Sequence, residues 1–292
     1  MASLWLLVAG GQARPPFQAD PPKTCENCEA WNRDRDPVRV FGNVYYVGTA
    51  ELSSILITSP AGHILIDGAI PQSAPLIDAH IRALGFRIGD VRLIVNSHTH
   101  YDHVGGLAAL QRASDAVVAA TRPAARALRE GHPTADDPQF ASEDNGFPPI
   151  RDVRVVEDGE TLHAGDLAIT AHLTPGHTPG STTWTWRSCE GERCLDFVYA
   201  DSVTAVSAPD YRFTSHPRAV EAFRRGLDTI ASLPCDVLLT PHPGASGMDA
   251  KLAALARGGA NPFVGTGACR AYAANGRRGL DARLATERAN PR

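Results

Sequence analysis

Apolar positions recur along the chain with two spacings, and each spacing predicts one kind of secondary structure. Runs of β-branched and apolar residues bounded by Gly, Pro or Asn predict strands within 38–47, 54–59, 63–67, 91–95, 116–120, 153–156, 167–173, 182–187, 195–200 and 237–240. Apolar residues three or four apart predict helices at 73–84, 107–112, 122–130, 217–233 and 250–257, and in the tail from residue 265. Two strand-rich runs, each followed by helices, predict an α/β (α+β) fold with two packed sheets and outer helices.

No linker or short repeat divides this pattern, so we expect a single domain over residues 38–292. Residues 14–37 are rich in Pro, Asp, Asn and Arg and predict an irregular N-terminal leader. Residues 131–151 also lack periodicity, although they lie inside the domain. A loop of that length in a compact domain is typical of a lid or a binding loop.

The first residues resemble the start of an exported protein. The apolar run at 4–9 is followed by Gly11-Gln12-Ala13, which has the small residues of a cleavage site. We therefore predict a signal peptide at residues 1–13, short or truncated because a basic leader is missing. A frayed apolar terminus is the alternative interpretation.

The cysteines favour the same interpretation. Their number is even, six, which favours disulfides and an oxidising compartment. Cys189 and Cys194 flank Glu-Gly-Glu-Arg between two predicted strands, which suits a disulfide across a hairpin. A second bridge, Cys235 to Cys269, would tie the C-terminal segment to the body. We therefore expect a periplasmic or secreted protein.

Cys25 and Cys28 have two interpretations. They form either a third, local bridge or half of a zinc knuckle. No second Cys-x-x-Cys and no nearby histidine pair completes a knuckle, so the bridge is favoured.

Charge and hydropathy exclude two classes of partner. The 292 residues carry a formal charge of -4, with an isoelectric point near 6.2, so a nucleic-acid-binding surface is not expected. No apolar run is long enough to cross a bilayer, so we expect no membrane span. Hydrophobic residues at 43% and charged residues at 21% are ordinary for a globular enzyme.

The strongest chemical signal follows the predicted strand at 91–95. Residues 97–106 read Ser-His-Thr-His-Tyr-Asp-His-Val-Gly-Gly, which places His98, His100, Asp102 and His103 within six positions. The cluster lies on a loop between a strand and a helix, where catalytic groups project from a rigid frame. Imidazole nitrogens and carboxylate oxygens are typical zinc ligands. The sequence therefore predicts a metal site here, rather than a hydrated polar loop.

Two more histidines lie at strand ends among Pro and Gly. His177 is in Thr-Pro-Gly-His-Thr-Pro-Gly, and His242 is in Thr-Pro-His-Pro-Gly. A rigid turn of this kind can aim an imidazole, so we expect both to be ligands. Asp67, at the end of an earlier strand, would either orient a ligand histidine or cap its own turn.

These motifs resemble the metallo-β-lactamase superfamily over about residues 38–263, and in detail they resemble subclass B3 of the zinc β-lactamases. The resemblance implies an αββα sandwich with two zinc ions. It assigns three histidines to one zinc and an aspartate with two histidines to the other: His98, His100 and His177; Asp102, His103 and His242. Asp102 also has a catalytic role, because it can orient the attacking water.

The segment after the strand at 195–200 distinguishes β-lactamases from other hydrolases of this superfamily. Thioester hydrolases of the glyoxalase II type place a metal-bridging aspartate at this strand end. Here the resemblance places Ser202 there, which implies contact with the substrate carboxylate, and Thr204 less surely. A shift of one residue would make Asp201 the bridging ligand instead. Ala50 is a departure, because some relatives have a cysteine at this position.

The expected function is zinc-dependent hydrolysis of the β-lactam amide by zinc-bound hydroxide, which confers resistance to penicillins, cephalosporins and carbapenems. We expect a monomer. The alternative enzyme is a thioester or lactone hydrolase with the same fold. A non-enzymatic zinc-storage protein is disfavoured, because it would tolerate lost ligands and all six are present.

Overall fold

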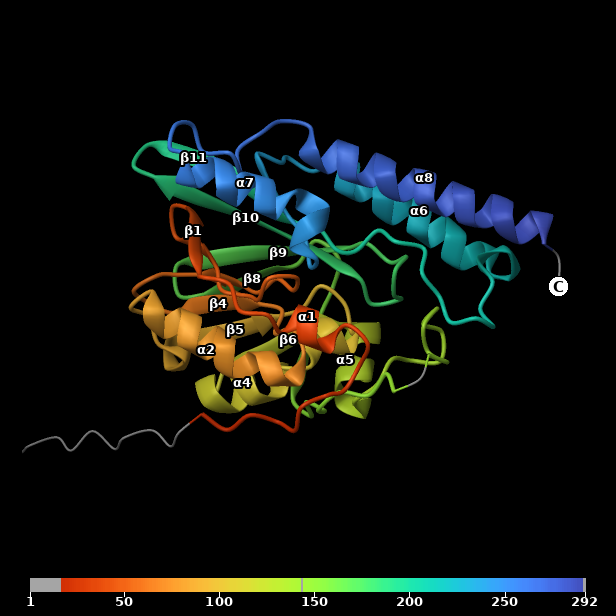
Figure 1. Ribbon diagram of the computed structural model, residues 1–292, viewed down its shortest axis with the longest axis horizontal. Helices are drawn as coiled ribbons and strands as arrows, with labels where there is room; N and C mark the ends of the chain where they lie inside the picture. Colours follow the sequence, from red (N-terminus) through yellow and green to blue (C-terminus); the bar gives the residue numbers. More distant parts are fainter. Residues whose placement is uncertain (1–16, 143, 291–292) are drawn as a thin grey trace, which may run out of the picture.

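Two β-sheets packed face to face form the centre of the structure, and helices cover the outer face of each sheet (Figure 1). The computed structural model describes residues 17–142 and 144–290. The layers run helix, sheet, sheet, helix, which confirms the predicted αββα sandwich. The predicted signal peptide at 1–13 lies outside the described residues.

The first sheet has seven strands in the order in which they occur along the chain. The pairs from β1 to β4 are antiparallel, and those from β4 to β7 are parallel. The strands are β1 Val38–Phe41, β2 Val44–Tyr46, β3 Ile55–Ile57, β4 His63–Ile66, β5 Val91–Val95, β6 Val117–Thr121 and β7 Val153–Val156.

The second sheet has five strands in the order β12-β11-β10-β9-β8. Only β11 and β12 pair in parallel. The strands are β8 Thr161–Ala164, β9 Leu167–Leu173, β10 Thr182–Glu190, β11 Arg193–Tyr199 and β12 Val237–Leu239.

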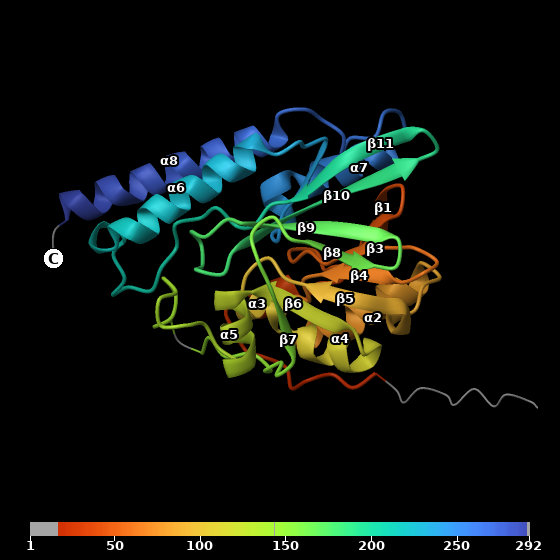
Figure 2. The ribbon, with the colours of Figure 1, turned by 180° about the vertical axis from the view of Figure 1, so that it is seen from behind.

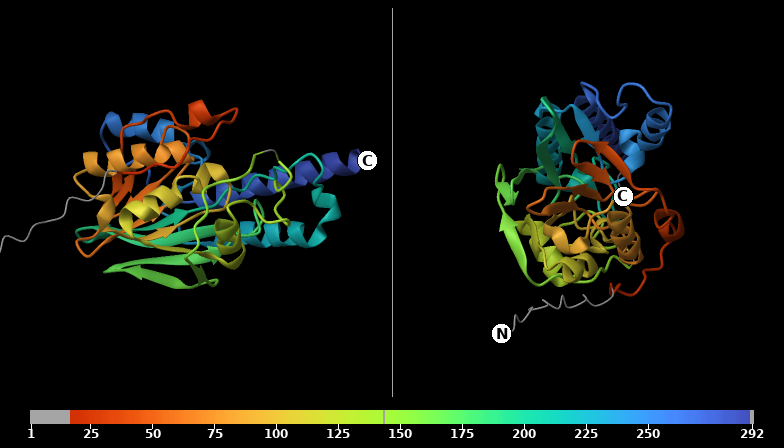
Figure 3. Two further views of the ribbon diagram at one scale, coloured as in Figure 1. Left: turned by 90° about the horizontal axis from the view of Figure 1, so that it is seen from below. Right: turned by 90° about the vertical axis from the view of Figure 1, so that its left-hand side faces the viewer.

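Helices α2, α4 and α5 cover the first sheet, whereas α6 and α8 lie side by side over the second and extend beyond it (Figures 2 and 3). The helices are α1 Cys28–Trp31, α2 Ala74–Ala83, α3 Tyr101–Val104, α4 Leu107–Ser114, α5 Arg122–Glu130, α6 Pro217–Ser232, α7 Met248–Ala256 and α8 Ala268–Ala289. None of the helices in the described residues is long and apolar enough to span a membrane.

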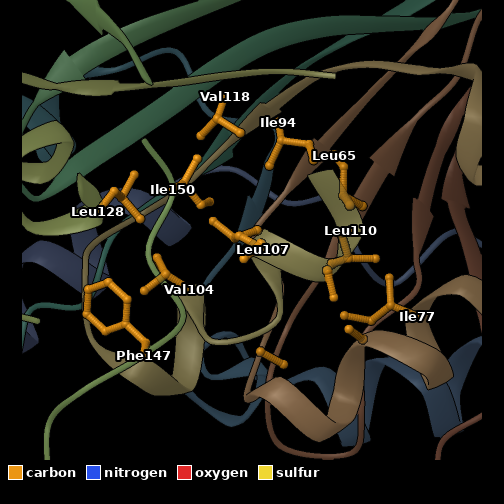
Figure 4. Packing of buried hydrophobic residues seen from close by; sticks show 14 of the residues in the cluster. Leu65, Ile77, Ile94, Val104, Leu107, Leu110, Val118, Leu128, Phe147 and Ile150 are labelled. Carbon is orange, nitrogen blue, oxygen red and sulfur yellow. The ribbon is translucent and has the colours of Figure 1, made fainter. Parts of the chain in front are cut away.

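The buried side chains form three layers that match these elements. One fills the space between the first sheet and its helices, where Leu107 and Leu110 of α4 meet Leu65 and Ile94 of the strands (Figure 4). The second lies between the sheets and contains Trp184, and the third lies under α6 and α8. Burial of this apolar surface provides the main stabilisation of the frame.

The structure differs from the predicted elements in three places. Strand β8 was not expected. Its side chains alternate between exposed and buried, but the strand has only four residues, too few for the alternation to stand out in the sequence. Helix α3 is a single turn within the predicted metal-binding loop. Helix α1 is a single turn within residues 14–37, which are otherwise irregular as predicted.

All three favoured disulfides are present. Cys189 and Cys194 are partners across the β10–β11 hairpin, Cys235 near β12 joins Cys269 of α8, and Cys25 joins Cys28. No cysteine remains for a zinc knuckle, because no described cysteine is free.

The buried carboxylate of Glu287 attaches the segment before α6 to α8. It accepts hydrogen bonds from the N–H groups of Phe213 (3.2 Å) and Thr214 (2.8 Å) and from Nε of Arg283 (2.7 Å). Burial alone would raise the pKa of Glu287, but the hydrogen bonds from Thr214 and Arg283 outweigh it and lower the pKa to about 2. The carboxylate is therefore the form that the fold stabilises.

We expect Glu287→Gln to destabilise the fold in a pH-dependent way. Because the folded pKa is below 4.5, the contribution is complete above pH 4.5 and is lost as the pH falls toward 2. Urea unfolding should show a loss of about 2–3 kcal/mol at pH 7, narrowing toward pH 2. Glu221→Gln, at an exposed ion pair with Arg225, is the matched control. A deficit independent of pH would contradict this account.

Candidate metal centre

Four strand ends meet at one end of the sandwich and carry most of the candidate ligands. His98 follows β5, His177 follows β9, Asp201 follows β11 and His242 follows β12. Helix α3 then turns the chain directly after His100, so that Asp102 and His103 point back toward the same place. The fold therefore gathers residues separated by up to 144 positions, as the sequence predicted.

The first set of predicted ligands is three buried histidines. Candidate ligand atoms of His98, His100 and His177 all lie within 4.8 Å of one another. Their ring centroids are 4.7–4.9 Å apart, with the rings close to perpendicular in pairs. Three converging imidazoles whose ligand atoms lie this close together are suited to holding one metal ion.

The second set lies beside the first. Oδ2 of Asp102 is 3.1 Å from Nε2 of His103 and 3.3 Å from Nε2 of His242. Ligand atoms of His98, Asp102 and His103 also lie within 4.8 Å of one another. The side chain of His242 is 42% exposed, whereas that of Asp102 is 10% exposed, so the centre opens to solvent on the side of His242.

Each histidine of the first set is held from behind by an oxygen atom. Nδ1 of His98 lies 2.8 Å from Oδ1 of Asp201, and Nε2 of His100 lies 3.2 Å from Oδ1 of Asp137. Nδ1 of His177 donates to the carbonyl of Thr204 at 2.9 Å. These contacts fix which ring nitrogen faces inward: Nε2 of His98, Nδ1 of His100 and Nε2 of His177.

The inward nitrogens fit a metal ion. Nε2 of His98 and both ring nitrogens of His103 are buried and have no hydrogen-bond partner among the described residues. A buried polar atom without a partner is unfavourable unless something binds it. A divalent cation such as zinc, which accepts imidazole and carboxylate ligands, would bind Nε2 of His98 and one ring nitrogen of His103.

Electrostatics also favour the ligand form of His98, His177 and Asp102. Burial lowers the pKa of His98 far below its usual value and, with repulsion from His98 and His100, that of His177 to about 3. These two rings are therefore neutral at pH 7. Burial alone would raise the pKa of Asp102, but His103 and His242 outweigh it and hold the carboxyl ionised. Neutral imidazoles and an ionised carboxylate are the species that bind metal.

Of the two roles that the sequence left open for Asp67, its hydrogen bonds show the one of fixing a turn. Its carboxylate accepts hydrogen bonds from the N–H and the hydroxyl of Ser97 and from the hydroxyl of Tyr199, each at 2.7 Å. Oδ2 of Asp67 also lies 3.9 Å from Nδ1 of His103. It therefore fixes the turn directly before His98 and lies behind a ligand of the second set.

The three candidate residues in the segment after β11, Asp201, Ser202 and Thr204, have different surroundings. Asp201 contacts the outer nitrogen of His98, as described above. Ser202 is buried, with 8% of its surface exposed. The hydroxyl of Thr204 lies 3.1 Å from Nδ1 of His177, so this side chain contacts a predicted ligand.

Three residues that contact the candidate ligands could not be predicted from the sequence. Asp137, in the loop 131–151, lies against His100, and Gln139 of the same loop lies 3.4 Å from Nδ1 of His100. Trp31 of α1 packs with its ring centroid 6.0 Å from that of His242. No local pattern identifies any of the three, because all act through contacts with distant segments.

A cavity of about 790 Å³ lies beside the loop of His177, between Pro138, Gly176 and the start of α6. None of the predicted metal ligands lines it.

Comparison with known proteins agrees with this geometry. The profile of the Metallo-beta-lactamase superfamily matches residues 51–242, which contain all six predicted ligands. The chain belongs to the metallo-beta-lactamase superfamily.

Solved structures of this superfamily match almost the whole chain. Rm3 metallo-beta-lactamase is 52% identical, with a TM-score of 0.88, over 91% of this chain and 100% of that chain. MEM-A1, a subclass B3 metallo-beta-lactamase from a soil metagenome library, is 44% identical, with a TM-score of 0.86, over 89% of this chain and 99% of that chain. Within the superfamily, this chain groups with subclass B3.

Curated relatives are more distant. A probable metallo-hydrolase of Burkholderia pseudomallei is 31% identical over 148 residues, which are 47% of this chain and 48% of the relative. The match spans about half the length of the curated relatives.

We expect Asp137→Asn to weaken metal binding. The amide keeps the shape but removes the negative charge behind His100, so zinc affinity should fall about 10- to 100-fold. Competition with a chromogenic chelator measures this directly. Asp136→Asn, one residue earlier and exposed, is the control. Equal affinities for the two variants would show that Asp137 does not support the ligand.

Proposed function

We propose that this protein hydrolyses the amide bond of β-lactam antibiotics with two zinc ions, as a monomer. The position of Asp201 carries the choice among hydrolases of this fold. A carboxylate engaged 2.8 Å from the outer nitrogen of His98 is a support for that ring rather than a bridge between metals. The similarity to Rm3 and MEM-A1, both metallo-beta-lactamases, supports the same reaction.

In this proposal, the six candidate ligands would divide between the two ions. One ion would be held by the three histidines supported from behind, and the other by the set around Asp102: His98, His100 and His177; Asp102, His103 and His242. Bound zinc would polarise the amide carbonyl and lower the pKa of a water molecule toward 7.

The chain's own residues then orient the reactants. Asp102 is ionised and contacts both His103 and His242, so its carboxylate can hold the proton of the attacking water. Ser202 would donate a hydrogen bond to the substrate carboxylate. Thr204 is less suited to that contact, because its hydroxyl already lies against His177.

An apolar rim suits the body of a β-lactam. Phe140 and Val206 are 44% and 49% exposed, which is unusual for large apolar side chains. Phe140 follows Gln139, which lies beside His100, and Val206 lies two residues after Thr204, which contacts His177. Both residues therefore belong to segments that reach the centre.

The three disulfides support export. They consume every described cysteine and require an oxidising compartment. We therefore place the working enzyme in the periplasm or outside the cell, where β-lactams act. Penicillins, cephalosporins and carbapenems are all candidate substrates, and hydrolysis would confer resistance.

The direct test is hydrolysis by the purified, zinc-loaded protein. We expect absorbance assays to show turnover of a penicillin and a carbapenem, abolished by a chelator and restored by zinc. His100→Ala and Asp102→Ala should each lower kcat/KM about a thousandfold or more, because each removes a ligand. His163→Ala, an exposed histidine on β8, should have no effect. Turnover of a thioester or lactone without any β-lactam turnover would reassign the protein to those hydrolases.

A further inference from the structure

The N-terminal segment, residues 17–36, runs along the body and reaches the metal centre, although the sequence predicts only an irregular leader there (Figures 1 and 3). It is anchored along its length. Arg112 of α4 binds Asp20 at 2.8 Å, and the hydroxyl of Ser73 donates to Asn32 at 2.8 Å. Trp31 packs on the ring of Tyr101, the residue directly before Asp102.

Lys23 is the most unusual residue of this segment. It is one of only two lysines in the chain, and its side chain is just 7% exposed. The side-chain amide of Gln72 binds the backbone of Lys23 twice, accepting from its N–H at 3.0 Å and donating to its carbonyl at 2.8 Å. The backbone of Lys23 is therefore fixed, and with it the point from which the side chain starts.

The ammonium group of Lys23 joins three parts of the fold. Nζ lies 4.5 Å from the ring centroid of Tyr101, forms an ion pair with Asp144 at 3.0 Å and donates to the carbonyl of Gly146 at 3.1 Å. Asp144 and Gly146 belong to the far end of the loop 131–151. Because the side chain of Lys23 is nearly buried, its interactions with these partners are stronger than those of an exposed ion pair.

The far end of the loop is in turn attached to the part beside the metal centre. The side-chain amide of Asn145 donates to the carbonyls of Gln139 and Phe140. Gln139 approaches His100, and Phe140 is the exposed apolar side chain of the rim. A continuous series of contacts therefore leads from Lys23 through the neighbouring Asn145 to Gln139, which lies beside His100.

We propose that Lys23 is a positioning residue that holds the loop 131–151 against Tyr101 and thereby fixes the part of the loop that lies beside His100, where the substrate would bind. It does not touch the metal ligands or the substrate. Its loss should weaken substrate binding and leave the chemical step largely intact. This inference deepens the proposed function, because an effect on KM presupposes a substrate.

Lys23→Met tests the proposal, because it keeps the apolar stem and removes the charge. We expect amide hydrogen exchange in residues 144–147 and 139–140 to be about tenfold faster than in the wild type. KM for a β-lactam should rise about three- to tenfold while kcat changes less than twofold. Zinc content should be unchanged. Lys23→Arg, which retains the charge, should recover part of the protection.

Two further variants make the result decisive. Asp144→Asn removes the ion pair from the exposed side of the loop and should act in the same direction, more weakly. Lys251→Met is the matched control, because that lysine lies over Phe263 in another part of the fold. Unchanged loop exchange in Lys23→Met, or faster exchange with unchanged KM, overturns the proposal. If the wild type hydrolyses no β-lactam, the proposed function fails, and the exchange data alone decide whether Lys23 holds the loop.

Discussion

The candidate site depends on the oxygen atoms that contact the outer nitrogens of three candidate ligand histidines and so fix the orientation of the rings. An imidazole has two nitrogens, and the metal requires the lone pair of one particular nitrogen to point inward. Asp201, Asp137 and the carbonyl of Thr204 each bind the outward nitrogen of one ring. The lone pairs are therefore aimed before any ion arrives, and the cost of ordering the ligands is met during folding.

The sandwich fold brings those oxygen atoms together. They come from the end of β11, from the loop 131–151 and from the segment after Ser202, which are far apart in sequence. Buried carboxylates are expensive to hold, as Asp67 shows: burial raises its pKa to about 7 in spite of the hydrogen bonds from Ser97 and Tyr199. Three disulfides and the apolar layers supply the stability that such a centre requires.

The sequence was informative where chemistry is local. His98, His100, Asp102 and His103 are within six positions, so their spacing alone predicts the metal site, and the apolar periodicity predicts most strands and helices. The sequence was uninformative where a role depends on a distant partner. Asp137 contacts a ring 37 residues away and Lys23 a carbonyl 123 residues away, and neither stands in a motif. Strand β8 was missed because four alternating residues carry too little signal.

The measurement that tests this account most directly is the tautomeric state of the ligand histidines in the metal-free protein. Nitrogen-15 NMR of histidine-labelled protein near pH 8, assigned with single-histidine variants, reports which ring nitrogen carries the proton. The account predicts protonation at Nδ1 for His98 and His177 and at Nε2 for His100. The opposite tautomers, or rings that exchange freely between both, would contradict a site arranged before metal binding.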